Sequence, residues 1–146
     1  MVAGITFRLL GPDDLAVLLA IPEGLFDEVC DPLQSAAFLN DPGHLLMLAF
    51  DGDLAVGMAS GTVLLHPDKP PAFLVNEVGV RDDWQQRGIA TATMQHLFAI
   101  VRARGYQGIW LGTEIDNAAA RGLYRKLGGD EVIAVLYGWD GALDDD

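Results

Sequence analysis

The sequence predicts a single mixed α/β domain, and three observations support this expectation. The chain has 146 residues, which is the length of one ordinary domain. Its hydrophobic content of 51% is enough for a substantial core. Its apolar patterns follow the order β-α-α-β-β-β-α-β-α-β. We assign residues 1–141 to the domain and residues 142–146, which end in a run of aspartates, to an acidic flexible tail.

The N-terminal part is expected to contain one strand and two short helices. Residues 5–10 alternate weakly between apolar and polar side chains, which is typical of a strand. Two aspartates then begin a helix with leucines on one face, and Pro22 ends it. A second helix is expected from Pro32 to about residue 41.

The central part is expected to supply three strands. Residues 44–50 and 54–65 read as two strands, and the Asp-Gly of residues 51–53 supplies the positive φ that a tight hairpin needs. Residues 73–80, FLVNEVGV, are nearly continuously apolar, which favours a central position in the sheet.

The C-terminal part is expected to alternate helices with strands. From Gly88 onward apolar residues recur at helical spacing, which predicts a helix that packs on the sheet and ends at Gly105. Residues 107–114 are the expected fifth strand and residues 117–128 a second amphipathic helix. Residues 132–139, VIAVLYGW, are the expected last strand.

The charge balance limits the classes of partner. Twenty-one acidic residues against nine basic ones give a formal net charge of -12. Such a chain is a poor sequence-independent binder of nucleic acid, which requires Lys and Arg contacts to phosphates. It favours cationic partners instead, although an acidic surface can also serve solubility alone.

Several further classes are disfavoured. No apolar run approaches the ~18 residues of a membrane span, and no secretory leader begins the chain, so we expect a cytoplasmic protein without a membrane partner. The one cysteine, Cys30, excludes an internal disulfide. Together with three scattered histidines it makes no metal-ligand pattern, so we expect no metal.

A glycine-bearing turn leads from the expected fourth strand into the long helix, through residues 85–91, QQRGIAT. The N-terminus of a helix has unpaired N–H groups and a positive dipole end, so it can bind phosphate. Gly88 would let the backbone approach a ligand closely. Neither GxxxxGK[ST] nor GxGxxG is present, which disfavours a P-loop and a dinucleotide site. By itself the turn could equally be an ordinary strand–helix connection.

A second motif follows one strand later. Residues 117–128 have the form N-x-x-A-x-x-L-Y-x-K-L-G, and residues 85–90 have the form Q-x-x-G-x-A. In this order and spacing the two motifs resemble those of the GNAT acetyltransferases, which use acetyl-coenzyme A. The resemblance implies the GNAT fold: a mixed, mostly antiparallel sheet, splayed between its fourth and fifth strands and flanked by helices.

The resemblance also implies where the cofactor binds. The backbone of the fourth strand would pair with the pantetheine arm, the turn would hold the pyrophosphate, and Asn117 and Tyr124 would lie near the thiol. The cofactor-binding residues expected from it are Val78, Val80, Gln85, Gln86, Arg87, Gly88, Ile89, Ala90, Thr91, Asn117 and Tyr124.

Transfer of an acetyl group from a thioester to an amine requires a base, a polarised carbonyl and a proton for the leaving thiolate. Tyr124, with an ordinary pKa of about 10, can donate that proton. The N–H of Val78 can polarise the carbonyl. Glu77 in the fourth strand and Glu114 at the end of the fifth are candidate bases, because a carboxylate in an apolar strand needs a partner or a function. His66 is the alternative base, and each carboxylate could instead be a solvated rim residue.

The connection between the first two helices is expected to line the acceptor site, and it is strongly acidic. Its carboxylates, with the two strand glutamates, indicate a polycationic amine as acceptor, although a solvated acidic loop is the alternative. The substrate-binding residues expected on this basis are Glu23, Asp27, Glu28, Asp31, Glu77 and Glu114.

A narrower resemblance concerns the substrate. The segments FRLLGPDDL, GLFDEVCD, LMLAFDGDLAVGMASG and NEVGVRDDWQQRGIATA are similar to those of GNAT-type aminoglycoside 3-N-acetyltransferases, which acetylate an amine of the deoxystreptamine ring and thereby confer antibiotic resistance. The pair Gly129-Asp130 departs from the family, in which a hydrophobic residue commonly follows Leu-Gly.

Three functions stay open at this point. They are an acetyltransferase for aminoglycosides or other polyamines, a peptide or protein N-acetyltransferase, and a non-catalytic acyl-CoA-binding module. The oligomeric state is open too, since residues 132–139 would suit either a homodimer contact or an internal strand.

Overall fold

A computed structural model of the chain describes residues 2–143. It divides into two compact units between Gly112 and Thr113. The aspartates at 144–146, which we assigned to a flexible tail, lie outside the described residues.

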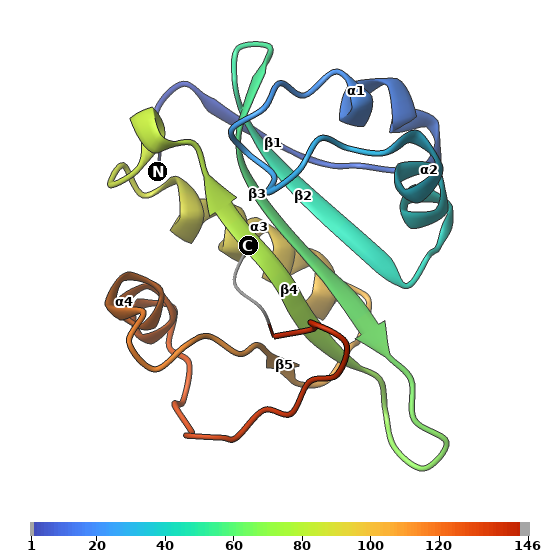
Figure 1. The fold of residues 1–146 in the computed structure, drawn as a ribbon, viewed down its shortest axis with the longest axis vertical. Coiled ribbons are helices and arrows are strands. Elements are labelled where there is room, and N and C mark those ends of the chain that lie inside the picture. The colour runs from blue at the N-terminus through green and yellow to red at the C-terminus, as the bar shows by residue number, and fades with distance from the viewer. Residues whose placement is uncertain (1, 144–146) are drawn as a thin grey trace. The chain divides into compact units, whose positions relative to one another are not determined.

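The first unit is built on one five-stranded sheet with the order β1-β2-β3-β4-β5 (Figure 1). The pairs β1–β2, β2–β3 and β3–β4 are antiparallel, and β5 runs parallel to β4. This confirms the expected mixed, mostly antiparallel sheet. The strands are β1 Ile5–Leu9, β2 His44–Asp51, β3 Leu54–Leu64, β4 Ala72–Val80 and β5 Ile109–Trp110.

The helices begin and end close to the predicted positions. Asp31 caps α2, because its side chain accepts a hydrogen bond of 2.8 Å from the N–H of Gln34, and Pro32 occupies the first turn, where no donor is needed. The helical elements are η1 Pro12–Asp14, α1 Leu15–Leu19, α2 Pro32–Asn40, η2 Asp82–Trp84, α3 Ile89–Ala103 and α4 Ala118–Lys126.

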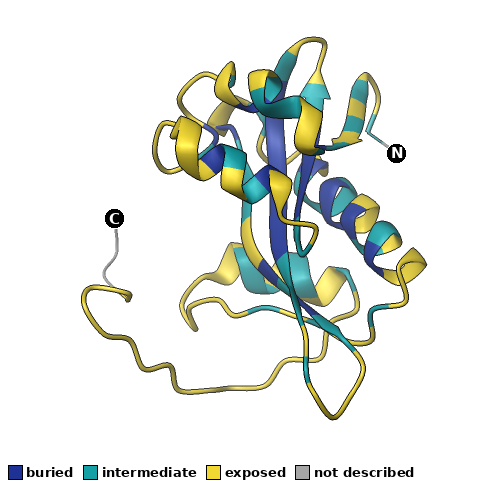
Figure 2. Ribbon diagram, turned by 90° about the vertical axis from the view of Figure 1, so that its right-hand side faces the viewer, coloured by how far each residue is buried: buried dark blue, intermediate teal, exposed yellow. Residues whose placement is uncertain are grey.

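Helices pack on both faces of the sheet in the first unit. Leu48 lies in a core cluster with Leu18 of α1 and Leu39 of α2. The next residue along β2, Ala49, points to the opposite face and packs with Ile89 of α3. Buried residues accordingly follow the central strands and the inner side of α3 (Figure 2).

A bulge interrupts the ladder between β3 and β4. Val75 pairs with Gly61 and Glu77 pairs with Ser60, so Asn76 is an extra residue in β4. Its amide donates a hydrogen bond of 2.7 Å to the Thr62 hydroxyl. An extra residue reverses which side of the strand each following residue faces.

The fourth and fifth strands separate soon after they meet. β5 pairs with β4 at Phe73 and Leu74. Beyond Leu74, no strand in the described part of the chain pairs with this edge of β4. This is the opening that the fold class implied between these strands.

The second unit contains α4 and irregular segments. The Asn117 side chain caps α4 by accepting a hydrogen bond of 3.0 Å from the Ala120 N–H. Gly128, at φ 86°, ends the helix region in the left-handed conformation that favours glycine.

Of the last two predicted strands, one is shorter than expected and the other is wrong. The fifth strand covers only Ile109–Trp110 of the expected residues 107–114. Residues 132–139 form no strand, and most of their large apolar side chains are exposed. An apolar alternating run is typical of an extended chain, but a strand also needs a neighbour to pair with, and this the pattern does not reveal. Among the described residues, no helix is long and apolar enough to cross a membrane.

Gly57 controls the approach of α3 to the sheet. A Cβ added there would lie 2.8 Å from Cγ2 of Ile89 and 3.3 Å from Cβ of Ala49. We expect Gly57→Ala to lower the free energy of unfolding by about 1–3 kcal/mol, as overpacking typically does. Urea unfolding followed by circular dichroism would measure this.

The matched control is Gly122→Ala in α4, where nothing lies within 4 Å of the added Cβ. A glycine inside a helix costs roughly 0.5–1 kcal/mol relative to alanine, so this variant should be slightly more stable than the parent. Equal stability of the Gly57→Ala variant and the parent would contradict the packing account.

Candidate functional site

The turn between β4 and α3 has an unusual backbone. Gln86 has φ 61° and Gly88 has φ 79°. Among the described residues other than glycine, only Gln86 and Asp140 have positive φ. Such conformations carry a cost for a residue with a Cβ and are common at functional sites. The backbone is therefore strained at the turn that contains the first sequence motif.

The turn presents unpaired donors. Gly88 is the N-cap of α3, and no side chain caps the helix there. The N–H groups of the first helical turn, which includes Ala90 and Thr91, have no carbonyl partner within the helix, and the positive end of its dipole lies here. The Ile89 side chain is buried against the sheet, so only its backbone can face a ligand, whereas Arg87 is exposed. These groups fit a pyrophosphate.

Hydrogen bonds show which residues of β4 face its open edge. The N–H of Arg81 donates to the carbonyl of Val56 on β3, at 2.9 Å. Because successive residues of a strand face opposite neighbours, Val80 and Val78 face away from β3. Consistent with this, the Val80 carbonyl accepts a hydrogen bond of 3.2 Å from the side chain of Gln85, which lies beyond the strand.

The bulge is the reason that these two valines face the opening. At the start of β4 the N–H of Phe73 donates to Gly108, at 2.9 Å, on the β5 side. In an uninterrupted strand Val78 would then face β3. The extra residue Asn76 reverses this order, so the N–H and C=O groups of Val78 and Val80 point to the edge that β5 leaves uncovered.

Glu77 lies on the face of the sheet that α1 and α2 cover. It pairs with Ser60, and the next pair on the same face is Gly79 with Met58, a member of the α1–α2 core cluster. The Glu77 side chain is exposed, but part of its carboxylate is shielded from water. This shielding, and then the charge of Asp27, raise the pKa of Glu77 above its usual value.

The acidic loop between α1 and α2 therefore lies near Glu77. Burial, followed by the charge of Glu77, raises the pKa of the Cys30 thiol. The backbone oxygen of Leu25 would lie 3.3 Å from a Cβ at Gly79, so the loop crosses β4 where that strand has no side chain. The sequence analysis missed this role of Gly79, although an isolated glycine in a strand is a signal for it.

The carboxylates of this loop have different surroundings. Asp27 is exposed and acts on Glu77, whereas Asp31 caps α2 and has a structural role. Glu23 and Glu28 are exposed. Their predicted contacts with a substrate stay predictions.

The second unit carries the other residues of the predicted site. Tyr124 on α4 is half-buried, and burial raises the pKa of its phenol, which keeps it protonated at neutral pH. Asn117 caps α4, and its role near a cofactor stays a prediction. Glu114 does not end the fifth strand as expected, because β5 ends at Trp110. It is exposed in the irregular segment before α4, where its backbone carbonyl accepts a bond of 3.0 Å from the Asn117 N–H.

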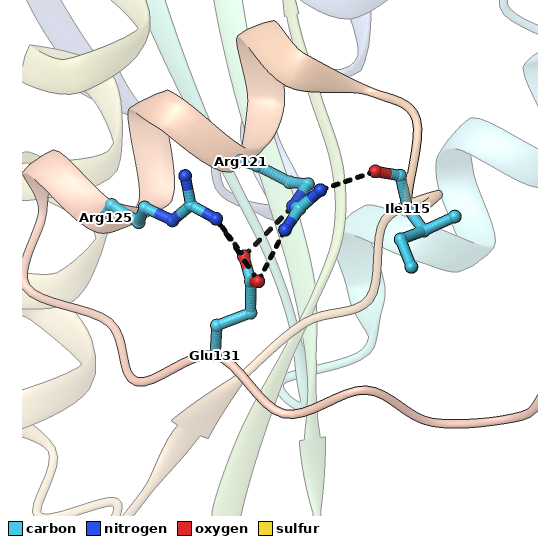
Figure 3. Close-up of polar contacts among 4 residues, drawn as sticks. All are labelled: Ile115, Arg121, Arg125 and Glu131. Carbon is cyan, nitrogen blue, oxygen red and sulfur yellow. Dashed lines mark hydrogen bonds and ion pairs between the residues drawn. The ribbon is translucent and has the colours of Figure 1, made fainter.

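Sequence reasoning missed an ion-pair cluster on α4 (Figure 3). Arg121 donates two hydrogen bonds to Glu131, at 2.7 and 3.1 Å, and Arg125 lies 3.2 Å from the same carboxylate. Arg121 also donates to the Ile115 carbonyl, at 2.7 Å. The segments before and after α4 are thereby tied to the helix that carries Tyr124. These bonds lower the pKa of Glu131 to about 2.

Other candidates lie elsewhere. His66 lies in the loop that precedes β4. Glu77 lies five residues after the first residue of β4, so roughly 16 Å of strand separates Glu77 from that loop. Among the described residues, no three His, Cys, Asp or Glu side chains are grouped to hold a metal. An open cavity of about 590 Å³ is lined by β1, α1 and the β2–β3 hairpin, and it includes none of the predicted site residues.

Comparison with known proteins places the chain in a family. Residues 15–129 match the model of the acetyltransferase (GNAT) family. The [ribosomal protein bS18]-alanine N-acetyltransferase of Escherichia coli strain K12 is 37% identical over 54 residues, which are 37% of this chain and 36% of that protein. The chain thus aligns with about a third of that relative's length.

Solved structures share the fold over nearly the whole chain. An aminoglycoside acetyltransferase from an uncultured soil metagenomic sample has a TM-score of 0.77 at 17% identity, with coverage of 94% of this chain and 97% of the other. The aminoglycoside 6'-N-acetyltransferase of Acinetobacter baumannii has a TM-score of 0.74 at 18% identity, with coverage of 94% and 98%. At this identity the likeness concerns the fold alone.

The ion-pair cluster on α4 gives a pH-dependent prediction. We expect an NMR titration of the Glu131 carboxylate to give a pKa of about 2 instead of the ordinary 4.5. Because this pKa is lowered on folding, the stabilisation is complete above pH 4.5 and is lost as the pH falls towards 2.

Two variants compare how much each arginine lowers the pKa of Glu131. Arg121→Met should raise the pKa of Glu131 more than Arg125→Met, because Arg121 contributes more to its lowering. High salt should raise the pKa of Glu131 as well, because salt screens ion pairs that are open to solvent. A titration midpoint near 4.5 in the parent chain would contradict the geometry of the cluster.

Proposed function

Because the chain belongs to the GNAT family of acetyltransferases, which use acetyl-CoA, we propose that it is an acyltransferase that moves an acetyl group from acetyl-CoA to an amine. The amine nitrogen attacks the thioester carbonyl carbon, a C–N bond forms, the C–S bond breaks, and the products are an amide and the free thiol. No covalent enzyme intermediate is involved, so Cys30 is not a nucleophile.

Two features support the cofactor site. The uncapped start of α3, with the positive φ of Gln86 and Gly88, suits a pyrophosphate. The outward N–H and C=O groups of Val78 and Val80 suit the amides of a pantetheine arm, which would add to β4 as a short strand.

Three residues would perform the chemistry. Glu77 accepts the proton of the attacking amine, directly or through water, and its raised pKa makes it a stronger base than a free carboxylate. The Val78 N–H polarises the carbonyl. Tyr124, held protonated, donates its proton or a hydrogen bond to the departing thiolate. Glu114 is a second candidate for the base.

The acceptor we propose is a small molecule with several amines, and an aminoglycoside in the first place. The single observation that carries this is that the acidic α1–α2 loop crosses β4 at Gly79, two residues after Glu77, whose pKa is raised by burial and then by the charge of Asp27 in that loop. Bringing like charges together costs free energy, and a bound polycation would repay it. The formal charge of -12 acts in the same direction.

The position acetylated is a separate matter. The sequence resemblance favours the 3-N amine of the deoxystreptamine ring, whereas the structural neighbour from Acinetobacter baumannii is a 6'-N-acetyltransferase. A second candidate function is N-terminal acetylation of a protein, which the relative from Escherichia coli favours by its name.

One assay tests these alternatives together. The purified chain is incubated with acetyl-CoA and, in parallel, with gentamicin-like aminoglycosides, spermidine and a peptide with an N-terminal alanine. Free thiol and product mass are recorded. Thiol release with a monoacetylated aminoglycoside supports the proposal, and fragmentation of the product gives the position. Turnover of the peptide alone would overturn it, and cofactor binding without any turnover would favour a non-catalytic module.

The turn generates a prediction about cofactor affinity. Gly88→Val places a branched side chain at φ 79°, where such a residue is strained, and at the backbone that would contact phosphate. We expect the Kd for acetyl-CoA, measured by calorimetry, to rise at least tenfold. Tyr124→Phe is the control: it should leave this Kd within twofold and lower kcat by about 10²-fold or more, as loss of an acid does. Normal cofactor affinity of Gly88→Val would refute the phosphate role.

The carboxylate pair generates a prediction about pH. Removing the charge of Asp27 lowers the pKa of Glu77, so Asp27→Asn should move the acidic limb of the kcat/KM profile to lower pH. Glu28→Gln changes an exposed neighbouring carboxylate and should leave the limb in place. Glu77→Gln should lower kcat by about 10²–10⁴-fold. An acidic limb that Asp27→Asn does not move would mean that Glu77 is not the base.

A further inference from the structure

Arg81 is a buried arginine at the junction of the two predicted substrate sites. It follows the last residue of β4 and is 9% exposed. Among the described residues, no carboxylate forms an ion pair with it. Its guanidinium donates instead to three backbone carbonyls: Nε to Ala55 at 2.7 Å, Nη2 to Pro22 at 2.8 Å and Nη1 to Glu23 at 2.5 Å.

These bonds join two parts of the fold. Ala55 belongs to β3, whereas Pro22 and Glu23 begin the loop between α1 and α2. The backbone of Arg81 continues into the turn between β4 and α3, and its carbonyl accepts a hydrogen bond of 2.9 Å from the N–H of Trp84. The side chain of Arg81 therefore binds the acidic loop, and its main chain binds the turn between β4 and α3.

The loop packs closely against the guanidinium. Gly24 has φ 105°, and a Cβ there would lie 3.0 Å from Nη1 of Arg81. The next residue, Leu25, is buried in the core, and the loop then reaches Asp27, which raises the pKa of Glu77. The start of the loop is thus fixed to the sheet only a few residues before its acidic part.

We propose that Arg81 is a positioning residue for the amine acceptor: it fixes the start of the acidic loop and thereby holds Asp27 beside Glu77. This inference rests on the proposed function. Arginine suits the task because its planar fork carries five donors in fixed directions, whereas the ammonium group of a lysine is a compact point charge. Arg81 contacts neither substrate, so its loss weakens acceptor binding and spares acetyl-CoA.

Cys30 provides a measurement that does not depend on catalysis. It is the chain's only cysteine, it lies in the same loop, and it is partly buried with a raised pKa, so it should react slowly with iodoacetamide. Arg81→Met should increase the rate of alkylation of the substrate-free protein about tenfold or more. Arg81→Lys, which keeps the charge and loses the fork, should fall between it and the parent.

Two controls separate the loop from general effects. Arg104→Met alters an exposed arginine and should leave the alkylation rate unchanged. Gly57→Ala perturbs the packing of α3 on the other face and should change the rate much less than Arg81→Met at comparable loss of stability. If Arg81→Met does not fold, Gly24→Ala perturbs the same contact from the loop, with Gly105→Ala, a positive-φ glycine with nothing within 4 Å, as its control.

The kinetic test separates positioning from a merely structural role. In the Arg81 and Gly24 variants the KM for the acceptor should rise at least fivefold, while the KM for acetyl-CoA stays within twofold. A parallel rise of both KM values would overturn the proposal, as would an alkylation rate equal to that of the parent. An Arg81→Lys variant that behaves as the parent would show that the three hydrogen bonds of the guanidinium are not what fixes the loop.

The same data distinguish this proposal from the proposed function. If the parent chain acetylates no amine while Arg81→Met still accelerates alkylation, the proposed function is wrong and the loop anchor stands. If the parent acetylates amines and alkylation is unaffected, the proposed function stands and the anchor is wrong.

Discussion

The open edge of β4 is the constraint on which the rest of the site depends. A strand edge with free N–H and C=O groups is a binding surface for another extended chain, and proteins normally cover it. Here β5 covers only the start of β4, at Phe73 and Leu74. The bulge at Asn76 then turns Val78 and Val80 towards the uncovered part. If Asn76 were paired regularly with β3, Glu77 and Gly79 would face the opening in their place.

Different elements cover the two faces of β4. On one face α3 packs against the sheet. Ile89 in its first turn is buried, which fixes the position of the N–H groups at the start of this helix. On the other face the acidic loop crosses the strand at Gly79, and Glu77 lies beside it. In the proposed function, cofactor and acceptor approach the same strand from different elements, as direct transfer between two substrates requires.

Electrostatics explains why so acidic a chain keeps a basic residue at this position. The α1–α2 loop carries four carboxylates, and it is held to the sheet by the buried Leu25 and by the hydrogen bonds of Arg81. Arg81 lies beneath its start and is satisfied by carbonyls, so its charge is not cancelled by one of these carboxylates. The loop thus keeps the negative charge that the proposed polycationic acceptor requires.

Much of this could be predicted from the sequence, and the exceptions have physical reasons. The strands in residues 44–65 and the helix from Gly88 have strong periodicity, and they form as expected. The bulge at Asn76 could not be predicted, because residues 73–80 are nearly continuously apolar and show no clear alternation whose phase could change. The carbonyl bonds of Arg81 and the pairing of Arg121 with Glu131 are tertiary contacts, which hydrophobic patterns do not encode.

The run at residues 132–139 shows the opposite error. Its apolar alternation is as clear as that of a true strand, yet it pairs with no strand in the described residues. Pattern describes what a segment could bury, whereas strand formation depends on an available edge. The two family motifs, by contrast, led to the correct family, whose model matches residues 15–129.

The central claim is that the open edge of β4 binds the cofactor, and amide hydrogen exchange tests it most directly. Exchange at Val78 and Val80 is measured with and without saturating coenzyme A. We expect both amides to exchange at least tenfold more slowly in its presence, whereas Arg81, already bonded to Val56, should change little. Coenzyme A binding, shown by calorimetry, without added protection at Val78 or Val80 would contradict the account.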